Sequence, residues 1–141
     1  MNITIREGRP QDETACAEVC YRAFKAIAEQ HNFPPDIPVP EVAYGLFTML
    51  FAQPNVYSLI AESNGRIVGS NFLWLDTVAA IGPISVDPEV QNAAIGRRLM
   101  EGILTHAAEK NCASVRLVQA GYHNLKQCIH HAKVGKRGSF S

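Results

Sequence analysis

The chain has 141 residues, of which 47% are hydrophobic, and its 13 Lys and Arg residues balance 13 Asp and Glu residues. A chain of about 150 residues buries roughly 68–70% of the surface that its unfolded form exposes, which is enough for one packed domain and excludes a disordered or solenoid protein. The formal net charge of zero disfavours a broad nucleic-acid surface and leaves room for a local phosphate site.

The amino terminus and the cysteines predict a cytoplasmic protein. No apolar run reaches the roughly 18 residues of a membrane span, and Met1 to Arg6 lack the apolar stretch of a signal peptide. The cysteines form no C-x-x-C pair and are too few for a disulfide framework, so reduced thiols are expected. They are Cys16, Cys20, Cys112 and Cys128.

The first part of the chain predicts a short strand and two helices. Thr4 to Arg6 has the pattern of a strand, and apolar residues then recur with helical spacing from about Pro10 to Gln30. Both cysteines of that helix fall on its buried stripe. Prolines exclude a helix between His31 and Glu41, and a second helix is predicted from about Val42 to Ala52.

The middle of the chain predicts an antiparallel meander of three strands. Tyr57 to Glu62 and Ile67 to Leu75 are apolar runs joined by Asn64-Gly65, a dipeptide typical of a type I′ hairpin turn. The third strand, Val78 to Val86, is interrupted by Gly82-Pro83, which predicts a bulge because proline removes a ladder donor.

The last predicted elements are a helix from about Asn92 to Lys110 and a strand from Val115 to Ala120. A strand, a helix and a second apolar strand form a right-handed parallel crossover. We therefore expect a mixed, twisted α/β sheet with helices on both faces, in a single domain over residues 1–135. Residues 136–141 are basic and lack an apolar pattern, so a disordered tail is expected there.

The segment from Ile84 to Leu99 has the pattern of an anion site. A strand feeds a short loop of small residues that opens into a helix, and the free N–H groups at a helix N-terminus bind phosphate. Arg97 and Arg98 could add charge-assisted contacts. The alternative is an ordinary strand-to-helix turn whose small residues only permit close packing, and the pattern alone does not separate the two.

The same segment carries a recognisable motif. Ile84-Ser85-Val86-Asp87-Pro88 is followed by Gln91-x-x-Ala94-x-Gly96 at the start of the long helix. This resembles the fingerprint of the GNAT family of acyl-CoA N-acyltransferases, an apolar-x-Val strand end and then Q/R-x-x-G-x-G/A. The order of the predicted elements is also similar to the family's order through the strand at Val115. Ala94 stands where the family more often has glycine, and alanine is small enough to let a phosphate approach.

The resemblance implies that the chain binds acetyl-CoA as a co-substrate. The diphosphate would rest on backbone amides at the helix start, and the pantetheine arm would run beside the preceding strand as an extra strand where the sheet splays. Backbone N–H groups at the bulge would stabilise an oxyanion on the thioester. The implied cofactor-binding residues are Ile84, Ser85, Val86, Gln91, Asn92, Ala93, Ala94, Ile95, Gly96, Arg97 and Asn124.

Catalytic candidates are few. The strand from Val78 to Pro83 lacks the carboxylate that some family members place there, and Asp76 and Asp87 are expected to be turn or cap residues. No general base is named. A segment beginning at Asn124 resembles the family pattern N-x-x-A-x-x-L-Y-x-K-x-G-F and puts His131 where the pattern has its Tyr, so His131 is a candidate acid. Alternatively, His131 is an exposed residue of a poorly ordered tail.

Two further expectations concern metal and oligomeric state. Cys128, His130 and His131 have no spacing typical of a structural zinc motif, so no metal is expected. The family's sheet continues with two more strands, which the residues after Gly135 cannot supply. We therefore expect a C-terminally incomplete fold, and a homodimer that covers the open sheet edge is one hypothesis.

The resemblance implies an N-acetyltransferase that moves acetyl from acetyl-CoA to a primary amine by direct attack, with no nucleic-acid or membrane partner. Two alternatives remain open: a non-catalytic acyl-CoA-binding module that acts as a sensor or interaction partner, and an unrelated α/β domain that binds another phosphorylated ligand.

Overall fold

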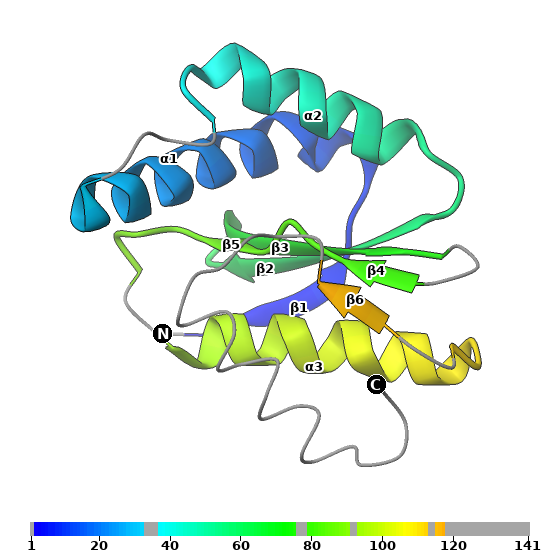
Figure 1. The fold of residues 1–141 in the computed structure, drawn as a ribbon. Coiled ribbons are helices and arrows are strands. Elements are labelled where there is room, and N and C mark those ends of the chain that lie inside the picture. The colour runs from blue at the N-terminus through cyan, green and yellow to red at the C-terminus, as the bar shows by residue number, and fades with distance from the viewer. Residues whose placement is uncertain (1, 33–36, 76–78, 91–92, 113–114, 118–141) are drawn as a thin grey trace.

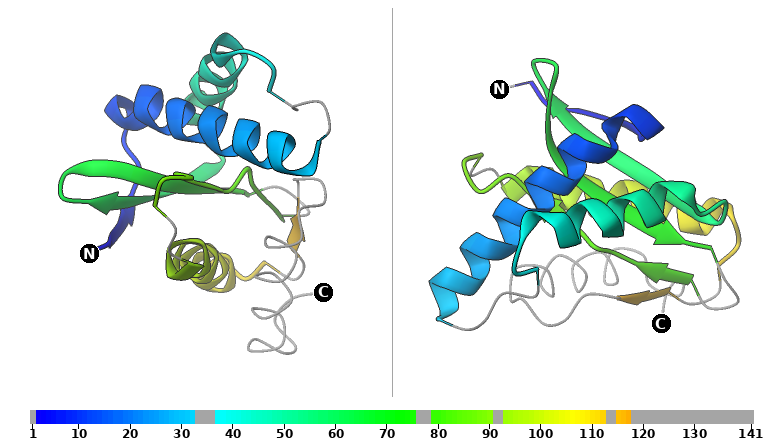
Figure 2. Two further views of the ribbon diagram at one scale, coloured as in Figure 1. Left: turned by 90° about the vertical axis from the view of Figure 1, so that its left-hand side faces the viewer. Right: turned by 90° about the horizontal axis from the view of Figure 1, so that it is seen from above.

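A central mixed sheet carries α1 and α2 on one face and α3 on the other in the computed structural model (Figures 1 and 2). The structure describes residues 2–32, 37–75, 79–90, 93–112 and 115–117. Its elements are β1 (Thr4–Glu7), a 3₁₀ turn (Pro10–Asp12), α1 (Glu13–His31), α2 (Pro40–Ala52), β2 (Val56–Ser63), β3 (Arg66–Trp74), β4 (Ala79–Ile81), β5 (Ser85–Val86), α3 (Ala93–Glu109) and β6 (Val115–Leu117).

The sheet has the strand order β1-β2-β3-β4-β6, with β5 paired to β3. Strands β1 to β4 pair antiparallel, whereas β4 and β6, which α3 connects, pair parallel. The expected crossover is therefore confirmed, as is the expected mixed α/β sheet with helices on both faces. Residues 118–120 of the predicted last strand and the predicted tail at 136–141 lie outside the described residues.

The hairpin between β2 and β3 forms as its sequence predicts. Asn64 and Gly65 have φ values of 53° and 78°. A type I′ turn needs positive φ at both central residues, and Asn-Gly supplies them at the lowest steric cost.

The predicted third strand is instead two strands. Gly82, Pro83 and Ile84 leave the ladder between β4 and β5, and the Gly82–Pro83 peptide bond is cis. Strand β4 pairs with Leu73 and Trp74, and β5 pairs with Gly69 and Ser70. The position of the interruption is confirmed, but its extent exceeds the predicted bulge because proline has no N–H to return to the ladder.

Each face of the sheet has its own apolar core. On one face Ile95, Leu99 and Ile103 of α3 are fully buried. On the other, Phe47 of α2 meets Phe72 of β3 edge to face, with ring centroids 5.4 Å apart. Cys16 and Cys20 are fully buried in this second core, as the helical spacing predicts.

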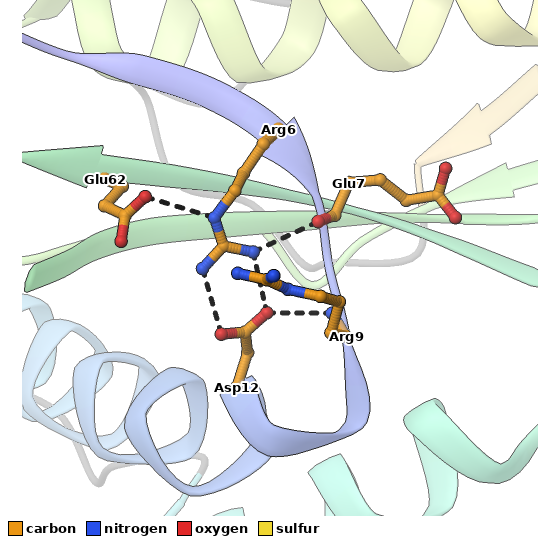
Figure 3. A network of polar contacts seen from close by, with 5 residues as sticks. All are labelled: Arg6, Glu7, Arg9, Asp12 and Glu62. Carbon is orange, nitrogen blue, oxygen red and sulfur yellow. Dashed lines mark hydrogen bonds and ion pairs between the residues drawn. The ribbon is translucent and has the colours of Figure 1, made fainter. Parts of the chain in front are cut away.

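A network around Arg6 joins β1 and β2 to the start of α1 (Figure 3). Its guanidinium donates to both carboxylate oxygens of Asp12, at 2.8 and 3.0 Å, and to Glu62 at 3.1 Å. Asp12 also accepts the backbone N–H of Arg9 at 2.8 Å. The bidentate pair fixes the angle at which the chain passes from the sheet into α1.

Among the described residues, no helix combines the length and the apolar character needed to cross a membrane.

Candidate functional site

Strand β5 presents an open edge beside α3. The N–H of Asp87 donates to the carbonyl of Val68 at 2.7 Å, so the backbone of Asp87 faces β3. Because backbone groups alternate along a strand, those of Val86 face the other side. Within the described part of the chain, β5 pairs with β3 alone, while β4 pairs with β6 on that other side. The sheet therefore opens at the step from β4 to β5.

Hydrogen bonds hold the break between β4 and β5 in place. The N–H of Gly82 donates to the carbonyl of Phe72 at 2.9 Å, and the indole of Trp74 donates to the carbonyl of Gly82 at 2.8 Å. Gly82 has a φ of 124°, a backbone conformation that residues with a side chain rarely adopt. The N–H of Phe72, opposite the break, is bound by the side-chain oxygen of Asn71 at 2.9 Å. The irregular segment thus has a fixed backbone.

Three buried polar atoms beside the break have no hydrogen-bond partner among the residues that the structure describes. They are Ser70 Oγ, Asn71 Nδ2 and Ser85 Oγ. Ser70 and Ser85 are cross-strand neighbours of β3 and β5, and Asn71 follows Ser70. Burial raises the pKa of the nearby thiols Cys16 and Cys20 to about 12, so both are neutral at physiological pH.

A tight turn connects β5 to the loop before α3. The side chain of Asp87 accepts the N–H of Glu89 at 3.0 Å, and its carbonyl accepts the N–H of Val90 at 2.9 Å. The expectation that Asp87 is a turn residue is therefore confirmed. Val90 is buried in the core beneath α3, so the turn is anchored at both ends.

The predicted anion-binding residues in the first turn of α3 differ in their exposure to solvent. Ile95 is fully buried, so only its backbone can face a ligand, whereas Ala94 and Arg97 are exposed. A Cβ added at Gly96 would lie 3.9 Å from Cγ2 of Val86, so this turn of α3 packs against the open strand β5. Arg98 donates to the carbonyl of Ile3 at 2.9 Å and so secures α3 to the chain before β1.

The structure therefore brings part of the predicted set together. Ile84 and Ser85 are buried, Val86 is half-buried, and all three lead toward the start of α3. Ala93 is the first residue of α3. The remaining candidates lie outside the described residues: Gln91, Asn92, Asn124, His131 and Asp76. In the described ranges no group of three or more His, Cys, Asp and Glu residues is placed to hold a metal ion.

Sequence reasoning missed three residues that shape this region. Trp74 donates to Gly82 at the strand break, and Asn71 accepts the N–H of Phe72 opposite it. No sequence motif predicts either contact. Arg22 of α1 reaches Asp87 across 65 residues of sequence. An arginine on the polar side of a helix carries no signal for such a pairing, which depends on where α1 crosses the sheet.

Comparisons with known proteins agree with this geometry. The family model described as "Acetyltransferase (GNAT) family" matches residues 23–135. An IAA acetyltransferase of Azospirillum brasilense is 25% identical over 144 aligned positions, which cover 99% of this chain and 88% of that protein.

Solved structures share the fold at low sequence identity. A GNAT family acetyltransferase from Brucella melitensis, in complex with acetyl-CoA, has a TM-score of 0.67 and 22% identity, covering 89% of this chain and 81% of its own. The ribosomal-protein-S18-alanine N-acetyltransferase from Escherichia coli has a TM-score of 0.71 and 20% identity, covering 92% and 76%. The PaiA N-acetyltransferase from Thermoplasma acidophilum, in complex with coenzyme A, has a TM-score of 0.72 and 17% identity, covering 95% and 89%.

Proposed function

The chain belongs to the acetyltransferase (GNAT) family, and on that premise we propose that it transfers the acetyl group of acetyl-CoA to a primary amine. The observation that carries the proposal is the open edge of β5, which runs from the strand break toward the first turn of α3. At this place an unpaired strand edge and the N-terminal turn of α3 adjoin.

The two ends of the edge suit the two halves of coenzyme A. The N–H and C=O of Val86 are available to the amides of a pantetheine arm lying as an added strand beside Ile84 to Val86. At the other end, backbone N–H groups in the first turn of α3, among them those of Ile95 and Gly96, and the exposed side chain of Arg97 suit a diphosphate. Gln91, Asn92 and Asn124 complete the proposed cofactor set in the part of the chain that is not described.

The strand break is the proposed reaction centre. The N–H of Gly82 is bound by Phe72, and Pro83 has none, so we assign the oxyanion donor to the N–H of Ile84. The neutral amine attacks the thioester carbon, the new C–N bond forms, and the C–S bond breaks. The amine nitrogen loses one proton to solvent water, and the departing thiolate takes one from His131, which remains the proposed acid.

A second candidate function is acyl-CoA binding without catalysis. Strand β4 reads Ala79-Ala80-Ile81 and offers no carboxylate as a base. A domain that binds the cofactor through backbone groups alone would serve as a sensor or interaction module.

One experiment separates these functions. Acetyl-CoA is titrated while thermal unfolding is followed, and thiol release is then assayed with a panel of amines. Stabilisation with thiol release supports the transferase, and stabilisation without release supports the binding module. No stabilisation at millimolar acetyl-CoA would contradict both.

A matched pair of variants tests the location of the site. Gly96→Trp should abolish the thermal shift, because its side chain fills the space beside Val86. Gly45→Trp is the control, since Gly45 is exposed on α2 with no atom within 4 Å of an added Cβ. An unchanged shift in Gly96→Trp would show that the first turn of α3 is not the phosphate site.

We further propose a cytoplasmic protein that forms homodimers over β6, which ends the strand order in the described part of the chain. Buried free thiols such as Cys16 and Cys20 suit a reducing compartment. Light scattering tests the assembly, and a monomeric mass at assay concentration would contradict it.

A further inference from the structure

Asp87 is a fully buried carboxylate shared by two arginines at the entrance to the loop before α3. Its Oδ2 lies 2.8 Å from Nη2 of Arg22 on α1 and 3.4 Å from Nη2 of Arg66 on β3. Its Oδ1 accepts the N–H of Glu89. One side chain thus connects α1, β3 and the turn that follows β5.

These contacts add to the backbone hydrogen bond from Val90 to Asp87 that already closes the turn. An ionised carboxylate in the interior is tolerated when it is paired and hydrogen-bonded, and both conditions are met here. The arginine side chains remain 46% and 61% exposed, so two positive charges at the surface face one buried negative charge. The exposed Glu89 lies in the same turn, so the two arginines there balance two carboxylates.

Resting on the proposed function, we propose that Asp87, held by Arg22 and Arg66, is a positioning residue for the diphosphate subsite of the acyl donor. Asp87 and Val90 fix the chain before the loop, and the buried Ile95 fixes it afterwards. The first N–H groups of α3 are then presented in one arrangement before the ligand arrives, which reduces the ordering cost of binding.

The role of Arg22 follows from the same geometry. Without Arg22, the carboxylate of Asp87 would keep the longer contact to Arg66 and the N–H of Glu89, but it would no longer tie the turn to α1. We therefore expect weaker binding of a donor that carries the diphosphate and unchanged binding of a donor that lacks it. A residue that only stabilised the fold would affect both donors equally.

The test compares acetyl-CoA with S-acetylpantetheine, which has the same thioester and lacks the 3′-phospho-ADP portion that contains the diphosphate. Dissociation constants are measured for wild type, Asp87→Asn, Arg22→Gln and Lys25→Gln. The last variant is the matched control, because it removes one positive charge from an exposed position on the same helix. Asp87→Asn and Arg22→Gln should bind acetyl-CoA about tenfold more weakly, the scale of one charge-assisted hydrogen bond, and S-acetylpantetheine as wild type does. Lys25→Gln should match wild type with both.

The outcomes are distinct. Equal losses for both donors, or no loss for acetyl-CoA in a folded Arg22→Gln, would overturn the positioning role while the proposed function stands. A similar loss in Lys25→Gln would show general electrostatics and would also overturn it. If wild type binds neither donor, the proposed function fails and this inference fails with it. Should Asp87→Asn not fold, Arg22→Gln decides, because its side chain is half exposed.

Discussion

The indole nitrogen of Trp74 donates a hydrogen bond to the carbonyl oxygen of Gly82 at 2.8 Å, which joins the end of β3 to the break between β4 and β5. The N–H of Gly82 is bound by Phe72 on the same strand. Both polar groups of the residue before Pro83 are therefore held by β3. The proposed oxyanion donor, the N–H of Ile84, follows two residues later.

Trp74→Phe should slow acetyl transfer more than it destabilises the protein. The variant keeps an aromatic ring but loses the bond to Gly82, so the break can shift relative to the thioester. We expect kcat to fall by about tenfold and the free energy of unfolding to fall by about 1 kcal/mol. Thiol release and urea unfolding measure the two effects.

Tyr44→Phe is the control for that variant. It also removes an aromatic hydrogen bond, from Tyr44 to Glu18 at 3.1 Å, but on the exposed side of α1 and α2. It should leave kcat unchanged. A Trp74→Phe enzyme with wild-type kcat would show that the indole contact does not matter for the reaction.

Gly69→Ala should destabilise the fold at the contact between β3 and β5. A Cβ at this position would lie 3.0 Å from the carbonyl oxygen of Ser85 and 3.1 Å from Leu99. The oxygen belongs to the backbone, so relief requires a movement of β5. We expect a loss of about 1–3 kcal/mol in the free energy of unfolding, measured with urea.

The opposite result is expected for Gly45→Ala, where an added Cβ meets no atom within 4 Å. Removing a glycine from an exposed helix position should raise stability by about 0.5–1 kcal/mol. A Gly69→Ala variant as stable as wild type would contradict the packing of β5 described above.

Asp12→Asn should remove stability that depends on pH. Hydrogen bonds from Arg6 lower the pKa of Asp12 below its ordinary value of 3.8, although burial opposes this. A lowered folded-state pKa gives stability that is present above pH 3.8 and is lost as the pH falls through the folded value. At pH 7 the variant should be less stable by about 1.5–3 kcal/mol, and near pH 3 the difference should narrow. Urea unfolding at both pH values checks this, and a constant difference would contradict it.

His106→Phe should flatten the stability profile on the acidic side of neutrality. His106 stacks on Tyr57 with ring centroids 3.5 Å apart, and burial, then Lys110, lowers the pKa of His106 below 6.5, while Glu109 and Glu7 oppose this. His106 therefore binds a proton more readily in the unfolded chain than in the folded protein. Wild type consequently loses stability as the pH falls below 6.5. Phenylalanine keeps a ring without the proton. Thermal unfolding from pH 7.5 to 5.5 should show a smaller decline in the variant, and equal declines would contradict the assignment.

Cys16 and Cys20 should resist alkylation in the folded protein. Burial, the largest effect, raises the pKa of each thiol to about 12, so the reactive thiolate is scarce and inaccessible. Treatment with iodoacetamide at pH 8, followed by peptide mass mapping, should leave both unmodified until urea is added. Of the three cysteines that the structure describes, Cys112 is only half-buried and should react first. Equal labelling of all three before unfolding would contradict the packing of α1.

The sequence by itself determined most of the elements, because their signals are local. Helical spacing located α1 and α3, Asn64-Gly65 located the hairpin, and Gly82-Pro83 located the break. The motif from Ile84 to Gly96 also pointed to the family before any contact was visible. Periodicity and turn chemistry are properties of neighbouring residues, and they are readable without a fold.

Only the tertiary structure decided which side chains hold the site together. Arg22 meets Asp87, Trp74 meets Gly82, and Arg98 meets the carbonyl of Ile3. Each pairing depends on how a helix crosses the sheet or how a strand leaves it. Such distances are set by the packing of whole elements, and the residues involved carry no mark of it in the sequence.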